Sequence, residues 1–227
     1  MASTALTLGV LPADLVTFPG VYSPQGDTHL LAHALAQEDL APGMNVLEIG
    51  TGTGALALQA ARRGALVTAV DVSWRAVLTA RLNAARGRLP LRVMHGDFAA
   101  RTAGRRFDLV LSNPPYVPAP GPPPSRGPER AWDAGPDGRG VIDRICASAP
   151  ALLRPGGVLL MVHSGMCGVQ ETVDRLSEEG MAVTVAARST VPWGPVLRSR
   201  RAWLEKRGLA AEAEQWEELV VVRARNL

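Results

Sequence analysis

The sequence predicts a single α/β domain spanning residues 1–227, built on one mostly parallel sheet of seven strands with helices on both faces. Short apolar runs rich in β-branched residues alternate with longer stretches of helical character. This alternation is typical of parallel sheets whose strands are joined by helical crossovers. The length, with 47% hydrophobic and 20% charged residues, suits a globular chain with one large core.

The elements follow one another without an internal repeat. The expected strands are Met44–Ile49, Leu66–Asp71, Leu91–His95, Phe107–Ser112, Val158–His163, Met181–Ala186 and Glu218–Arg223. The expected helices between them are His29–Glu38, Ala55–Arg63, Ser73–Arg86, Arg139–Leu153 and Gly168–Glu179.

Two stretches depart from this rhythm. Residues 117–130 are proline-rich and cannot enter the interior of a helix or a sheet, so we expect an exposed loop. This loop is either an insertion without a role or a lid that faces the substrate. Residues 190–214 lie between the last two expected strands, and Val196–Arg207 has helical character. We expect a helical insertion there, at a sheet end or as an arm that shapes the substrate site.

The charge balance argues against a dedicated nucleic-acid-binding module. The chain has 24 basic and 21 acidic residues and a net charge of +3, and neither half is strongly basic. One local cluster is predicted to be a solvated helix face, with a phosphate-binding patch as the alternative. Its members are Arg198, Arg200, Arg201, Lys206 and Arg207.

Cysteine usage and the N-terminus predict a reduced, cytoplasmic protein without a metal site. Cys146 and Cys167 are too few and too isolated for a disulfide framework or a zinc site. Residues 1–16 lack a basic region, and no apolar run approaches the ~20 residues that cross a bilayer. We therefore expect no membrane partner.

A glycine-rich turn follows the first strand. Residues 46–54 read VLEIGTGTG, an apolar strand that leads through three glycines into a helix. Glycines at such a turn permit positive φ and close approach of a ligand to the backbone. The N–H groups that open the helix suit a carboxylate or a pyrophosphate. The spacing Gly50-x-Gly52-x-Gly54 differs from the dinucleotide fingerprint, and Glu48 precedes it.

Acidic residues stand at the ends of successive strands. Asp71 ends the second strand, where a carboxylate can accept hydrogen bonds from both ribose hydroxyls of an adenosine. Asp97 follows the third strand and could accept from an adenine amino group, while Phe98 could pack on the ring. Carboxyl ends of strands are where open α/β sheets bind ligands.

Across residues 44–98 this order of motifs resembles the class I methyltransferases, which have a Rossmann-like fold and use S-adenosylmethionine (AdoMet). The resemblance implies AdoMet rather than NAD as the cofactor. The residues that we expect to bind it here are Glu48, Gly50, Thr51, Gly52, Gly54, Asp71, Val72, Asp97 and Phe98, together with Asn113.

The most informative stretch is Ser112-Asn-Pro-Pro-Tyr116, directly after the fourth strand. Its prolines fix φ and remove N–H donors, which makes a rigid loop with two outward acceptors, the Asn113 side-chain oxygen and the Pro114 carbonyl. Two such acceptors can hold the N–H groups of an amide or amine and stabilise the charge that arrives with a methyl group. Tyr116 can lie against the planar group. We expect Asn113, Pro114, Pro115 and Tyr116 to form the catalytic motif.

Asn-Pro-Pro-Tyr in this position resembles the signature of amino-methyltransferases, including N6-adenine and guanine-N2 enzymes and the glutamine methyltransferases of release factors. Residues 21–31, VYSPQGDTHLL, resemble a segment of the short, HemK-related glutamine methyltransferases that packs over the cofactor. This resemblance implies AdoMet-pocket roles for Tyr22, Pro24, Asp27 and Thr28. Asp27 could alternatively cap a helix, and both roles are compatible.

Two further stretches extend the resemblance. Residues 132–138, WDAGPDG, are similar to the stretch that follows the catalytic loop in HemK relatives, and residues 153–157, LRPGG, match the turn before the fifth strand. Bacterial release-factor enzymes usually carry a separate N-terminal helical domain, whereas here only residues 1–26 precede the Asp27 segment. The chain is closer to the short form, which works with a small zinc-binding activator subunit.

The sequence therefore predicts an AdoMet-dependent N-methyltransferase whose acceptor is a glutamine amide in a protein loop, as in release factors. Three alternatives stay open: an RNA or DNA amino-methyltransferase, a small-molecule N-methyltransferase, and a non-catalytic AdoMet-binding protein. The basic cluster at 198–207 favours the nucleic-acid enzyme, and the even charge balance opposes it. The intact Asn113 motif opposes the non-catalytic protein.

Overall fold

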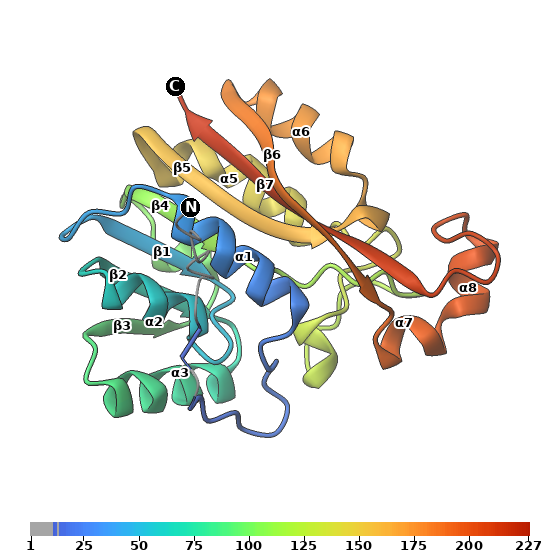
Figure 1. The fold of residues 1–227 in the computed structure, drawn as a ribbon, viewed down its shortest axis with the longest axis horizontal. Helices are drawn as coiled ribbons and strands as arrows, with labels where there is room; N and C mark the ends of the chain where they lie inside the picture. Colours follow the sequence, from blue (N-terminus) through green and yellow to red (C-terminus); the bar gives the residue numbers. More distant parts are fainter. Residues whose placement is uncertain (1–10, 13) are drawn as a thin grey trace, which may run out of the picture.

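The fold was obtained as a computed structural model, which describes residues 11–12 and 14–227 (Figure 1). Most of residues 1–16, which lack the basic region of a targeting signal, therefore lie outside the described residues. The seven strands form one sheet in the order β3-β2-β1-β4-β5-β7-β6. They are β1 (Asn45–Ile49), β2 (Leu66–Asp71), β3 (Leu91–His95), β4 (Phe107–Ser112), β5 (Leu153–Ser164), β6 (Met181–Pro192) and β7 (Trp216–Asn226).

Strands β1 to β5 are parallel, and β7 enters the sheet antiparallel between β5 and β6. The expected mostly parallel α/β sheet is confirmed. The last three strands are longer than their apolar runs indicate. Strands β6 and β7 form a hairpin that continues past the end of β5 (Figure 1). The expected turn at 153–157 lies within β5 as an irregularity, because Phe107 pairs with Leu153 and Leu109 already with Val158.

Helices cover both faces of the sheet. The helices are α1 (Gly26–Gln37), α2 (Ala55–Arg62), α3 (Trp74–Gly87), α4 (Phe98–Arg101), α5 (Ile142–Leu152), α6 (Val169–Glu178), α7 (Pro195–Ser199) and α8 (Arg201–Lys206), with short 3-10 turns η1 (Pro128–Ala131) and η2 (Gly165–Cys167). Helices α1 to α3 pack on one face and α4 to α6 on the other, and the two core clusters take alternate residues of each strand. None of the helices in the described part of the chain has the length and apolar composition needed to span a bilayer.

Between β6 and β7, the short helices α7 and α8 stand at the far end of the hairpin (Figure 1). We call residues 193–215 the arm. Its own small core contains Trp193, Leu197 and Leu204. Two members of the basic cluster are engaged within the protein, because Arg200 pairs with Asp133 and the Arg201 guanidinium lies over the Trp193 ring. The cluster is therefore not a uniformly solvated face.

Candidate active site

A cavity of about 800 Å³ opens at the carboxyl ends of β1, β2 and β4. The segment before α1 forms one wall, and the end of the proline-rich loop with the two residues after it (125–128 and 130–132) forms another. The structure brings most of the expected site residues together here, although they come from four separate parts of the chain. The expected residues that line the cavity are Tyr22, Pro24, Asp27, Thr28, Glu48, Gly50, Thr51, Gly52, Asp71, Val72, Asn113, Pro114, Pro115 and Tyr116.

The buried Glu48 side chain stabilises the glycine-rich turn. Gly50 and Gly52 have φ of 73° and 53°, the left-handed region in which a side chain is strained. The buried Glu48 carboxylate accepts hydrogen bonds from the Thr51 hydroxyl and, at 3.2 Å, from the Ala57 N–H in the first turn of α2. Burial raises the pKa of Glu48 to about 8, although both hydrogen bonds act to lower it. The turn is thereby fixed before any ligand arrives.

Asp71 stands at the end of β2 with its carboxylate already oriented. Its Oδ2 accepts from the Gly52 N–H at 3.0 Å and its Oδ1 from the Ser73 N–H at 2.8 Å. Burial raises the pKa of Asp71 against these two hydrogen bonds. Each oxygen keeps a further lone pair, so the carboxylate can still accept from ribose hydroxyls.

Three of the expected cofactor residues lie outside the cavity lining. Gly54, with φ of 83°, packs α2 against α3, and a Cβ there would lie 3.2 Å from the Ala80 Cβ. The Asp97 carboxylate caps α4 and pairs with Arg144 at 2.5 Å. Phe98 is buried in the core beneath α5. At this strand end the lining is instead His95, with Trp74 stacked on it at 4.0 Å.

The catalytic motif is anchored through Asp27 of α1. Its Oδ2 accepts from both tyrosine hydroxyls, at 2.8 Å from Tyr22 and 2.9 Å from Tyr116. Its Oδ1 accepts from the Thr28 hydroxyl at 3.1 Å, and Thr28 Oγ1 in turn accepts from Asn113 Nδ2 at 3.3 Å. Burial, followed by the charge of Asp27, raises the pKa of Tyr116 well above its usual range, so Tyr116 stays a neutral donor.

This anchoring fixes the orientation of the Asn113 amide. Because its nitrogen faces Thr28, its Oδ1 is the end left to accept from a substrate. No hydrogen bond among the described residues uses Asn113 Oδ1 or the Pro114 carbonyl as an acceptor. The site therefore offers two uncommitted oxygen acceptors beside the buried Tyr116 ring, and it can receive two N–H groups of a planar substrate.

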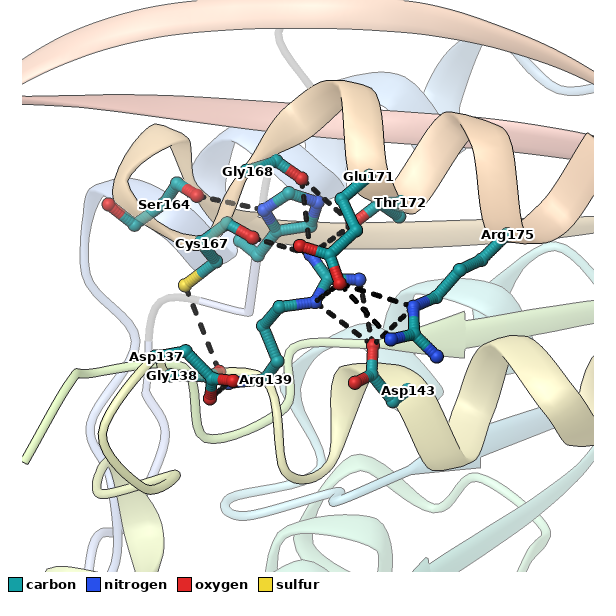
Figure 2. A network of polar contacts seen from close by, with 11 residues as sticks. Asp137, Gly138, Arg139, Asp143, Ser164, Cys167, Gly168, Glu171, Thr172 and Arg175 are labelled. Carbon is teal, nitrogen blue, oxygen red and sulfur yellow. Dashed lines mark hydrogen bonds and ion pairs between the residues drawn. The ribbon is translucent and has the colours of Figure 1, made fainter.

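A buried arginine, Arg139, lies at the centre of a network of polar contacts that includes Cys167 (Figure 2). Arg139, 3% exposed, forms ion pairs with Asp143 at 2.7 Å and Glu171 at 3.1 Å and donates to the Cys167 carbonyl. The Cys167 thiol donates to the Tyr116 carbonyl at 3.1 Å. Burial raises the pKa of Cys167, so it acts here as a neutral donor. The Tyr116 carbonyl is thus turned away from the cavity.

Glu217, at the start of β7, is a buried carboxylate that the sequence did not single out. Burial raises its pKa from 4.5 to about 7, and the charge of Asp27 adds to the rise while a hydrogen bond with Ser164 opposes it. Its Oε1 is buried and has no hydrogen-bond partner among the described residues. The folded state therefore favours the protonated carboxyl.

We expect Glu217→Gln to stabilise the fold at high pH. Between pH 4.5 and 7 the unfolded chain releases this proton and the folded chain keeps it, so the wild type loses stability as pH rises. The free energy of unfolding of the variant relative to wild type should increase by about 2 kcal/mol from pH 5 to pH 8. Urea unfolding at the two pH values measures this, with the exposed Glu212→Gln as control. An equal difference at both pH values would contradict the buried, protonated Glu217.

Several lining residues escaped the sequence-based prediction. They include Trp74, His95, Arg130 and Trp132. Trp74 opens α3 after β2 and His95 ends β3, both where a ligand site was expected, but their residue types carry no motif. Arg130 and Trp132 belong to the loop after the catalytic motif, and only the tertiary fold brings that loop over the cavity.

Comparison with known proteins gives one consistent family. Residues 12–120 match the methyltransferase small domain family. A Methanocaldococcus jannaschii protein assigned as a protein N5-glutamine methyltransferase is 34% identical over 77% of this chain and 88% of its own length. The release factor glutamine methyltransferase of Deinococcus radiodurans is 42% identical over 61% of this chain, which spans only 52% of that enzyme.

Solved structures share the fold. A chain of the E. cuniculi Mtq2-Trm112 complex, responsible for methylation of the termination factor eRF1, matches with a TM-score of 0.63 and 23% identity over 92% of this chain and 99% of that one. The T. thermophilus 16S rRNA N2 G1207 methyltransferase, in complex with AdoMet and guanosine, matches with a TM-score of 0.61 and 26% identity. The match covers 93% of this chain and 46% of that one. The expected class I methyltransferase fold is confirmed. Fold, motifs and relatives together show that the chain belongs to the HemK-related family of glutamine methyltransferases.

Proposed function

We propose that this protein transfers the methyl group of AdoMet to the side-chain amide nitrogen of a glutamine in a protein substrate, as a release-factor-like N5-glutamine methyltransferase. The observation that carries the proposal is the oriented Asn113 amide next to the free Pro114 carbonyl, at the mouth of a cavity that also holds Asp71 and the glycine-rich turn. The relatives named above as glutamine methyltransferases support the choice of an amide acceptor.

The residues present fit AdoMet. Asp71 would accept from the ribose hydroxyls, Val72 would contact the adenine, and the turn at Gly50 and Gly52 would face the amino-acid end of the cofactor. When bound, AdoMet supplies a methyl group on a positively charged sulfur. Asp27, Tyr22 and Thr28 hold the wall between the cofactor end and the acceptor end.

The acceptor amide is positioned by its two N–H groups. Asn113 Oδ1 would accept one and the Pro114 carbonyl the other, which would orient the amide nitrogen toward the cofactor end of the cavity. The same two oxygens would stabilise the positive charge that develops on the amide nitrogen when it takes the methyl group from the sulfur of AdoMet. The nitrogen would release one N–H proton to solvent water, which leaves a neutral N-methyl amide, with S-adenosylhomocysteine as the other product. The Tyr116 ring packs against the flat amide.

Labelled AdoMet tests the proposal directly. The chain is incubated with methyl-labelled AdoMet and cell extract, and the product is divided between nuclease and protease treatment. We expect the label to survive nuclease, to be lost on proteolysis, and to elute as N5-methylglutamine after complete proteolytic digestion. Label that survives protease and is lost to nuclease would overturn the protein substrate. Extract is included because the E. cuniculi relative works in a two-protein complex.

The same fold serves an rRNA substrate in the T. thermophilus enzyme, so an RNA amino-methyltransferase is the second candidate. In this chain two arginines of the basic cluster that favoured this candidate, Arg200 and Arg201, make contacts within the protein. The nuclease arm of the experiment separates the two candidates.

A further inference from the structure

An ion pair joins the arm to the loop that follows the catalytic motif. Arg200, between α7 and α8, donates through Nη1 and Nη2 to the two carboxylate oxygens of Asp133, at 2.6 and 2.9 Å. Its Nη1 also donates to the Pro118 carbonyl at 3.0 Å. The Arg200 and Asp133 side chains are only 19% and 11% exposed. A bidentate pair at this depth has a fixed geometry, unlike a solvated surface pair.

Pro118 and Asp133, which accept hydrogen bonds from Arg200, belong to two short segments that pair beside the acceptor end of the cavity. Val117 and Asp133 form a parallel bridge, in which the Val117 N–H donates to Trp132 at 2.7 Å and the Ala134 N–H to Val117 at 3.1 Å. The Ala119 N–H continues it to Gly135 at 2.9 Å. We call residues 117–119 and 132–135 the bridge. Val117 and Trp132 of the bridge line the cavity next to Tyr116.

The arm also packs on the bridge. Val117 lies against the small core of Trp193, Leu197 and Leu204, and Met166 of η2 joins this contact. Arg200 is therefore the polar anchor of an otherwise apolar contact. By contrast, Asn113 and Tyr116 are held from the other side by Thr28 and Asp27. The chemistry and the outer wall have separate supports.

We propose that Arg200 is a positioning residue that, through Asp133, sets the acceptor-side wall of the active site and so determines how tightly the acceptor binds. The effect on acceptor binding rests on the proposed function. The role of Arg200 in holding the bridge rests on the geometry alone. Because the Asn113 support is independent, loss of Arg200 should impair acceptor binding more than the transfer step. The cofactor end, built by β1 and β2, should be unaffected.

Arg200→Met keeps the apolar stem and removes the pair. With the methylated protein or a glutamine peptide from it as acceptor, we expect KM to rise about tenfold, with kcat and the Kd of AdoMet within about threefold. The matched control is Arg198→Met, an exposed arginine of α7 two residues before Arg200. The exchanged pair Arg200→Asp with Asp133→Arg should recover part of the loss. An unchanged KM in Arg200→Met, or an equal rise in Arg198→Met, would overturn the proposal.

Amide hydrogen exchange gives a readout that needs no activity. Protection of the bridge amides of Val117, Ala119 and Ala134 should fall at least tenfold in Arg200→Met and stay unchanged in Arg198→Met. Unchanged protection would overturn the positioning role even if KM rises. Should the wild type methylate no glutamine at all, the proposed function fails, and the exchange measurement still decides whether Arg200 holds the bridge.

Discussion

Replacing Asn113 by alanine should lower turnover by roughly 100- to 1,000-fold, the usual cost of losing one group that stabilises transition-state charge. AdoMet affinity should stay within several-fold of wild type, because Asn113 Nδ2 donates to Thr28 and makes no contact with the Asp71 end. Single-turnover transfer from labelled AdoMet measures the rate, and calorimetric titration measures the affinity. An unchanged turnover would contradict the acceptor role.

Thr28→Val provides a graded comparison for this prediction. Valine has nearly the shape of threonine but cannot accept the Asn113 N–H, so the amide loses the contact that fixes its orientation. We expect a smaller fall in turnover, about tenfold, with the thermal midpoint close to wild type. A loss as large as that in Asn113→Ala would instead indicate that Thr28 has a role of its own in the reaction.

Asp71→Ala should weaken AdoMet binding by about 100-fold, the value of two hydrogen bonds to a charged acceptor. The reason is twofold: the ribose would lose its acceptor, and the Gly52 and Ser73 N–H groups would lose the carboxylate that orients the turn. Calorimetric titration measures the Kd, and turnover at saturating AdoMet should recover most of the wild-type rate. Normal affinity would refute the ribose assignment.

Asp97→Ala is the matched control for Asp71, since it removes the carboxylate at the next strand end. Its side chain lies outside the cavity lining and pairs with Arg144 on the surface. We expect AdoMet affinity within about threefold of wild type, because exposed pairs contribute little. A loss comparable to that of Asp71→Ala would restore the adenine-binding role expected from the Gly96-Asp97 turn.

Much of the fold could be predicted from hydrophobic periodicity and from the turn residues that end each strand. The parallel strands β1 to β4 agree with their apolar runs to within a residue, because buried parallel strands are continuously apolar and end abruptly at polar turns. The long hairpin of β6 and β7 did not follow. From Ala187 onward β6 is an edge strand with alternating half-buried and exposed residues, and beyond Ser189 it pairs with β7 past the end of β5, so no apolar run marks this part.

The chemistry could be predicted from the sequence, since the proposed roles of the glycine turn, the acidic strand end and the rigid Asn-Pro-Pro-Tyr loop depend on local backbone geometry. The folded arrangement was needed to show which acidic residues line the cavity, that Asp27 accepts from both tyrosines, and that Arg200 pairs with Asp133, 67 positions away in the chain. Hydrogen bonds between distant segments depend on how helices and loops pack, and that information is spread over the whole core.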